Sequence, residues 1–151
     1  MVNDLPVMLN GSRARVPYGT DPVLLLYFLD EHTYLPEPGG MWVAGGERSE
    51  IIIRTGEPLD TLTVTLHTTV ANEVVLDGGG VVRRMTLAPG VGATASVPME
   101  AVATRGSFAY LFRISTTHGD VPALVEPGSQ DPRFLGVRMD LRGHRPVAGQ
   151  P

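Results

Sequence analysis

The segment LDTLTVTLH, residues 59–67, indicates the fold class of this 151-residue chain. Apolar and polar residues alternate along it, with Leu62, Val64 and Leu66 on one side and mainly threonines on the other. A period of two residues is typical of a strand that buries only one of its faces. The segment therefore predicts a half-buried antiparallel β-strand.

Other segments on both sides of it also have strand character. Residues 108–115 and 134–141 alternate in the same way, and residues 23–29 form a continuous apolar run. The remaining predicted strands are residues 41–44, 50–54, 73–76, 81–87 and 92–97. The strands 73–76 and 81–87 are expected to form a hairpin with a short glycine loop. Gly- or Pro-containing turns separate these short segments, and no amphipathic helix is evident. The pattern predicts an all-β fold, an antiparallel β-sandwich of eight or nine strands, jelly-roll or immunoglobulin-like.

The length of the chain fits one domain with a substantial core. Residues 1–21 contain several Pro, Gly and Asn residues and are expected to form an extended N-terminal arm. The sandwich domain is predicted to span residues 22–142. Residues 143–151 are polar after Gly143 and are expected to form a flexible tail.

The composition excludes several classes of function. The chain has no Cys, and all twelve of its basic residues are Arg, so thiolate, disulfide and Schiff-base lysine chemistry are impossible. The net charge of −4 and the scattered arginines argue against a nucleic-acid partner. No run approaches the roughly 20 apolar residues of a membrane span, so direct membrane insertion is not expected. Residues 1–9 lack the basic and apolar regions of a signal peptide.

Residues 27–46, YFLDEHTYLPEPGGMWVAGG, contain the main candidate binding residues. This stretch holds four aromatic residues, including the only Trp. Exposed aromatic rings serve as flat platforms for sugars, and Tyr34, Trp42 and Glu37 are the predicted ligand-binding residues. Trp42 lies between Met41 and Val43, and we expect it to be buried as a core anchor. Tyr34, beside Pro36 in the bend, is the better candidate for an exposed platform.

Acidic residues also gather around this bend. The carboxylates of Asp30, Glu31 and Glu37 could hold a Ca²⁺ ion together with backbone carbonyls. The run lacks the DxDxDG spacing of a strong calcium motif, and the alternative is a solvated turn. No other cofactor is predicted.

Sequence motifs for catalysis are absent. No GxSxG elbow or HExxH motif occurs, and no GxGxxG precedes a helix. The acidic residues of the bend could supply a carboxylate pair for glycoside hydrolysis, but no second acidic strand end accompanies them. We therefore expect this chain not to be an enzyme, with a small hydrolase as the disfavoured alternative.

Two stretches, residues 24–46 and 131–141 (DPRFLGVRMDL), resemble a module of bacterial envelope proteins. The shared features are an aromatic-Leu-Asp turn, the Pro-Glu-Pro-Gly-Gly bend, an aromatic-Val strand and a closing Arg-Phe-Leu-Gly-Val strand. In that family the β-sandwich is the C-terminal domain. It follows a membrane glycosyltransferase domain and lies outside the membrane. The resemblance implies an accessory domain in the periplasm or outside the cell, with any catalysis in a parent protein.

Two hypotheses of function follow. The first is a non-catalytic, carbohydrate-binding-like module whose partner is a glycan. The second is a structural or assembly module that contacts another protein chain through sheet edges or an apolar patch. The sequence leaves the ligand and the oligomeric state open.

Overall fold

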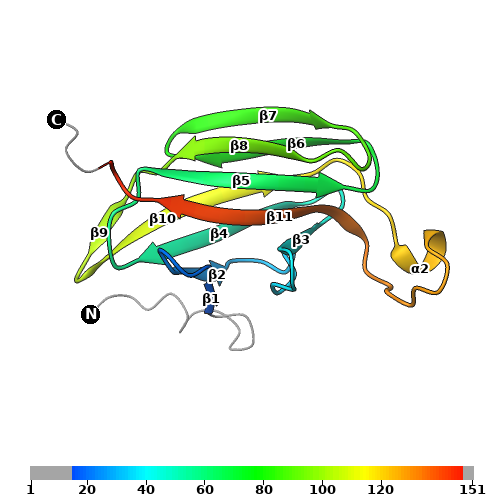
Figure 1. Ribbon diagram of the computed structural model, residues 1–151, viewed down its shortest axis with the longest axis horizontal. Helices are drawn as coiled ribbons and strands as arrows, with labels where there is room; N and C mark the ends of the chain where they lie inside the picture. The colour runs from blue at the N-terminus through cyan, green and yellow to red at the C-terminus, as the bar shows by residue number, and fades with distance from the viewer. Residues whose placement is uncertain (1–14, 148–151) are drawn as a thin grey trace.

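A computed structural model describes residues 15–147, which form two antiparallel sheets packed face to face (Figure 1). Sheet A has the order β1-β2-β4-β10-β6-β7, with β9 beside β10, and sheet B has the order β3-β11-β5-β8. This arrangement confirms the predicted all-β antiparallel sandwich. The strands are β1 (Val16–Tyr18), β2 (Leu24–Phe28), β3 (Met41–Ala44), β4 (Arg48–Thr55), β5 (Thr61–Thr68), β6 (Asn72–Gly78), β7 (Val81–Leu87), β8 (Ala93–Pro98), β9 (Val102–Thr104), β10 (Ser107–Ser115) and β11 (Leu135–His144).

The core lies between the two sheets. Alternate residues of the long strands supply it, as the period of two predicted, and each is at most 3 % exposed. These residues are Leu62, Val64 and Leu66 of β5, Tyr110, Phe112 and Ile114 of β10, and Leu135, Val137, Met139 and Leu141 of β11. The polar alternates of the same strands therefore form the two outer faces.

The structure contains two strands that the sequence pattern did not predict. β1 has three residues, one of them Pro17, and pairs with β2 at the edge of sheet A. Proline is tolerated on an edge strand because no outer neighbour needs its missing N–H. β9 also has three residues and pairs only with β10. Strands this short are below the length at which a period of two can be recognised.

The predicted domain limits need adjustment at both ends. The expected arm, residues 1–21, includes β1, so part of it belongs to sheet A; residues 1–14 lie outside the described residues. The expected tail, residues 143–151, begins inside β11, which continues to His144 and pairs with Thr61 there. Residues 148–151 again lie outside the described residues.

The predicted hairpin between residues 73–76 and 81–87 is confirmed. β6 and β7 pair from Asn72 opposite Leu87 to Gly78 opposite Val81. Gly79 and Gly80 form the turn with φ of 56° and 77°. A two-residue turn with positive φ at both positions suits the right-handed twist of paired strands, and glycine adopts it without strain.

Helix is minor in the described residues: α2 (Pro122–Val125) is a single turn in the connection between β10 and β11. Within residues 15–147, no helix has the length and apolar character that a membrane crossing requires.

The short length of β3 determines where the molecule is open. β3 pairs with Leu135–Met139 of β11, whereas β5 pairs with β11 from Val137 to His144. The part of β11 beyond Met139 therefore has no β3 partner. The bend before β3 and the segment around β1 flank β11 on that side instead.

Candidate functional site

Trp42 faces outward from sheet B, so the expectation that it is a core anchor was wrong. Its neighbours Met41 and Val43 are both fully buried, whereas Trp42 is partly exposed. Successive residues of a strand point to opposite faces, so burying these two neighbours puts the indole on the outer face. Met41, Trp42 and Val43 are all apolar, so the sequence could not show which of the two faces would be buried.

Tyr34 lies beside Trp42 on the same outer face. The segment before the bend bridges to β3, with Thr33 opposite Val43, and the Tyr34 N–H donates to the Trp42 carbonyl at 2.8 Å. Thr33 is fully buried with Val43, so the next residue along, Tyr34, shares the outward side with Trp42. Both predicted aromatic residues are therefore adjacent and partly exposed.

Arg133 holds Tyr34 in place. Its guanidinium lies 5.1 Å from the centre of the Tyr34 ring, within the range of a cation–π contact. The same guanidinium donates from Nη2 to Asp131 at 2.6 Å and from Nη1 to Glu37 at 3.0 Å. The hydrogen bonds from Arg133 lower the pKa of Asp131. Glu37, a predicted ligand-binding residue, is therefore already paired with Arg133.

Arg138 continues the outer face on the other side of Trp42. It pairs with Trp42 in the register of β11 and β3, and its guanidinium carbon lies 6.0 Å from the centre of the indole. A Cβ placed on Gly39 would lie 3.4 Å from Arg138 Nη1, and one on Gly40 would lie 3.3 Å from its Cγ. The two glycines of the bend therefore let the arginine pack closely beside the aromatic platform.

His67 extends this row onto β5. It pairs with Arg138 in the register of β11 and β5, and it is exposed. Tyr34, Trp42, Arg138 and His67 thus form one transverse row on the outer face, which we call the aromatic–arginine row. Two aromatic residues followed by two hydrogen-bonding side chains suit a flat ligand with polar edges.

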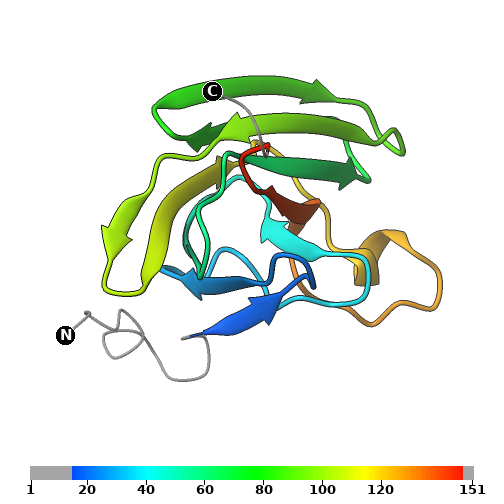
Figure 2. The same ribbon diagram turned by 60° about the vertical axis from the view of Figure 1, so that its left-hand side comes forward.

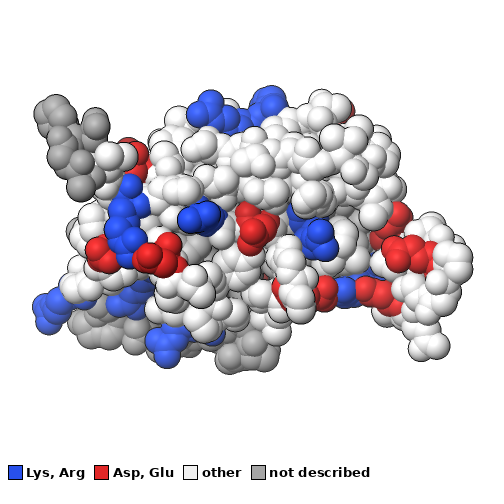
Figure 3. Space-filling model, viewed as in Figure 1, with Lys and Arg blue, Asp and Glu red and all other residues white. Residues whose placement is uncertain are grey.

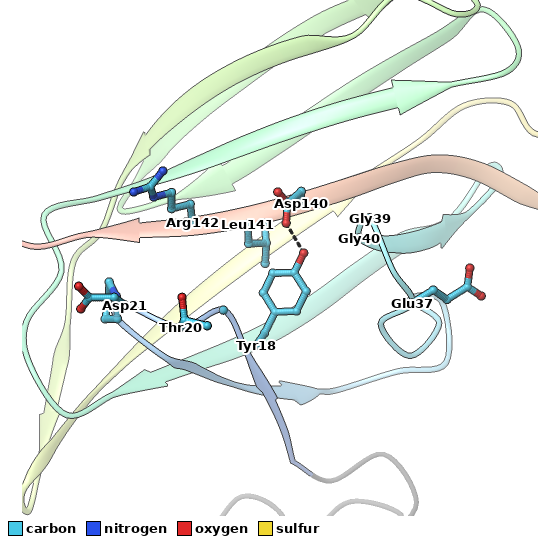
Figure 4. Close-up of a pocket in the computed structure, with 11 residues that line it drawn as sticks. Tyr18, Thr20, Asp21, Glu37, Gly39, Gly40, Asp140, Leu141 and Arg142 are labelled. Carbon is cyan, nitrogen blue, oxygen red and sulfur yellow. Dashed lines mark hydrogen bonds between the residues drawn. The ribbon is translucent and has the colours of Figure 1, made fainter.

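A hollow of about 660 Å³ adjoins the row, where β11 lacks its β3 partner (Figure 4). Gly39 and Gly40 line it from the bend, and Asp140, Leu141 and Arg142 line it from β11. The residues numbered 18–22, which lead from β1 to β2, form another side. Because Arg138 packs on the two glycines, the row and the hollow are adjacent parts of one site.

Tyr18 points into the hollow toward β11 (Figure 4). Its hydroxyl donates to the carboxylate of Asp140. Partial burial, together with the hydrogen bond to Asp140, raises the pKa of Tyr18 above its ordinary value. Tyr18 and Asp140 therefore fix each other, and the phenol stays neutral at ordinary pH.

Charges alternate along the exposed side of β11. Arg138, Asp140 and Arg142 all face outward, and Figure 3 shows basic and acidic side chains interspersed over this side of the molecule. The period of two in β11 predicted that these three side chains share a face. Nothing in the sequence indicated that they would border a hollow, because that depends on where β3 ends.

The three carboxylates predicted to hold Ca²⁺ do not form a group. Asp30 accepts from Ser49 Oγ at 2.9 Å and from the Glu50 N–H at 2.8 Å, while Glu37 is paired with Arg133. Glu31 is exposed. Among residues 15–147 no three His, Cys, Asp or Glu side chains lie close enough to hold a metal ion. Asp30 instead connects its turn to β4, and a metal ion at this bend stays a prediction.

No protein-family profile matches this sequence, and no curated protein matches it. Solved structures similar to this chain include TmCBM61, a carbohydrate-binding module in complex with beta-1,4-galactotriose. It is 10 % identical, with a TM-score of 0.34, and the likeness covers 80 % of this chain and 88 % of that one. Similarity at this level does not extend to a shared ligand or site.

Proposed function

We propose that this protein is a non-catalytic glycan-binding module and that its site is the aromatic–arginine row with the adjoining hollow. The observation that carries the proposal is the placement of Tyr34 and Trp42 side by side, partly exposed, on the outer face of sheet B. A sugar ring has an apolar face that stacks on an aromatic side chain and hydroxyl groups around its edge. The row offers both kinds of contact.

The site is held in shape before any ligand arrives. Arg133 fixes Tyr34 through Asp131 and Glu37, and Tyr18 fixes Asp140. Side chains that are already ordered lose less conformational entropy on binding. A prearranged platform beside an open hollow is therefore suited to binding part of an extended glycan.

The carboxylates near the platform favour binding over hydrolysis. Glycoside hydrolysis requires two carboxyl groups that flank the scissile bond, one of them available as an acid. Glu37 is occupied by Arg133, and Asp140 accepts the Tyr18 hydroxyl. These contacts support a role for both groups in holding the site together.

A wider context is also part of the proposal: a domain of a bacterial envelope or secreted protein, in the periplasm or outside the cell. The support is the resemblance of residues 24–46 and 131–141 to the extramembrane module of membrane glycosyltransferases. In this structure the two stretches include β3 and most of β11, which pair directly. The shared sequence features would therefore belong to one surface, which is the surface proposed to bind glycans.

A glycan array with the wild-type protein tests the proposal. We expect one class of glycan to bind, Trp42→Ala to abolish that binding, and Trp42→Phe to retain part of it because a ring remains. Val82→Ala is the control, since Val82 is 50 % exposed on β7 of the opposite sheet. Absence of binding to every glycan, or equal binding by Trp42→Ala and wild type, would overturn the proposal.

A protein–protein module is the second candidate function, and one observation favours it. The α2 segment stands away from the sandwich (Figure 2), and Leu124 and Val125 on it are 81 % and 57 % exposed. Apolar side chains on a projecting turn are typical of contact surfaces. Native mass spectrometry distinguishes this alternative: a stable oligomer that Leu124→Asp dissociates would support it.

A further inference from the structure

The arginines of the described residues fall into two groups. One group contacts carboxylates, carbonyls or hydroxyls, and it includes Arg48, Arg113, Arg133 and Arg145. Those without an ion pair or hydrogen bond among residues 15–147 are Arg15, Arg84, Arg105, Arg138 and Arg142. Within the second group only Arg138 is partly buried, while the other four are exposed to solvent.

A partly buried arginine without a partner needs an explanation. The Nε of Arg138 is buried and has no hydrogen-bond partner among the described residues. Burying a charged donor without a partner is unfavourable, and such groups are uncommon in folded proteins. The guanidinium packs against Trp42 and the Gly39–Gly40 bend, and it makes no ion pair among residues 15–147. Its position is therefore fixed while its hydrogen-bonding capacity is unused.

The charged side chains on the outer side of β11 are two arginines and one acid, while Asp21 and Glu37, which also line the hollow, are paired with Arg145 and Arg133. Asp140 is the acid next along the outer side of β11, and it already accepts the Tyr18 hydroxyl. Arg142 follows it, and His67 lies across from Arg138 on β5 and adds a further hydrogen-bonding group. Two guanidinium groups and one carboxylate along β11 favour an anionic ligand over a cationic one.

We propose that the glycan bound at the aromatic–arginine row contains a uronic acid, and that Arg138 binds its carboxylate. The inference rests on the proposed function. A guanidinium and a carboxylate form two parallel hydrogen bonds, and this pairing is stronger than a neutral hydrogen bond. A uronic acid carries its carboxylate on the sugar ring, so one sugar unit can stack on Trp42 and reach Arg138 at the same time.

The experiment compares acidic and neutral forms of the same glycan. An array containing neutral, uronate-containing and sulfate-ester glycans selects the best uronate-containing binder. Isothermal titration calorimetry then measures the affinity for that oligosaccharide and for its carboxyl-reduced counterpart, in which a neutral hydroxymethyl group replaces the carboxylate. We expect carboxyl reduction to weaken binding about tenfold or more, as loss of a charge-assisted contact does.

Variants assign the effect to Arg138. Arg138→Gln should weaken binding of the uronate glycan about tenfold and leave binding of the carboxyl-reduced form nearly unchanged. Arg138→Lys keeps the charge but lacks the two-pronged geometry, so an intermediate loss is expected. Arg84→Gln removes the same charge from β7 of sheet A and should change neither affinity. Thermal melts of each variant confirm that it is folded.

The outcomes separate this inference from the proposed function. If neutral glycans bind through Trp42 and carboxyl reduction has no effect, the uronic acid assignment is wrong and glycan binding stands. If only sulfate esters bind, the carboxylate assignment is also wrong. If Arg84→Gln weakens binding as much as Arg138→Gln does, the effect is general charge and the role of Arg138 is disproved. Failure of every glycan to bind overturns both proposals.

Discussion

Arg113 and Arg138 occupy comparable places on the two outer faces of the sandwich, yet their surroundings differ. Arg113 of β10 donates from Nε to Glu50 at 2.6 Å and lies 3.6 Å from Asp77, and the hydrogen bond to Glu50 raises its pKa. Arg138 of β11 lies beside an indole and two glycines and makes no ion pair within residues 15–147. Neighbouring carboxylates therefore satisfy the charge of Arg113, whereas the guanidinium of Arg138 remains available to a ligand.

This difference separates residues that stabilise the fold from residues that are free to recognise something. A charged group that is already paired gains little from a ligand, because a contact within the protein would first have to break. An ordered but unpaired group loses no such contact on binding. Stability measurements on variants of each kind test that distinction, beginning with the largest expected effect.

Substitutions on the two faces of β3 should differ most in their effect on the free energy of unfolding. Met41→Ala removes a fully buried side chain and is expected to lower the free energy of unfolding by about 2–5 kcal/mol. Trp42→Ala, one residue along, removes an outward side chain and should cost only about 1 kcal/mol. Urea denaturation of both variants measures the two values. A larger loss for Trp42→Ala than for Met41→Ala would reverse the assignment of the faces.

Asp30 should behave as a paired structural carboxylate. Its oxygens accept from Ser49 Oγ and from the N–H groups of His32 and Glu50, so Asp30→Ala is expected to cost about 1–3 kcal/mol. Glu31→Ala, at the exposed neighbour, should stay within about 0.5 kcal/mol. Thermal melts with and without a chelator complete the test. A fall in Tm on chelation would show that a metal ion contributes to this turn after all.

Substitutions of Arg113 and Arg138 should change the free energy of unfolding least, and the two changes should differ in sign. Arg113→Met loses partly exposed ion pairs, which are typically worth about 0.2–1 kcal/mol. Arg138→Met removes a buried Nε that has no partner, so stability should stay the same or rise slightly. Chemical denaturation at low and high salt compares them. Loss of stability on Arg138→Met greater than on Arg113→Met would mean that Arg138 is a structural residue.

Much of the fold could be predicted from the sequence because the alternation of buried and exposed side chains along a β-strand is a local pattern. The buried faces of β5, β10 and β11 follow directly from the spacing of residues such as Val64, Phe112 and Met139. The turn at Gly79–Gly80 was equally clear, since a tight hairpin needs residues that adopt positive φ. Trp42 was misplaced because β3 has only four residues, all apolar, and shows no alternation.

The candidate site could be predicted from the sequence only in part, for a different reason. Tyr34, Trp42 and Glu37 were named from residue type, and the structure does bring the two aromatic residues together. The acid expected to bind metal, Asp30, instead meets donors on β4 about 20 residues away, as its bond to Glu50 shows. Which acid meets which donor depends on the pairing of strands, and a local pattern cannot supply it.

The amino-acid pattern alone was enough to establish a β-sandwich and the polar side of its regular strands, because side-chain direction in a strand repeats every two residues. What those polar sides form depends on the folded arrangement of the chain. Tyr18 reaches Asp140 across 122 positions of sequence, and the hollow exists because β3 begins only opposite Met139. The lack of an ion pair at Arg138 within the described part of the chain has the same reason: its neighbours are set by the register between distant strands, which forms only when the two sheets assemble.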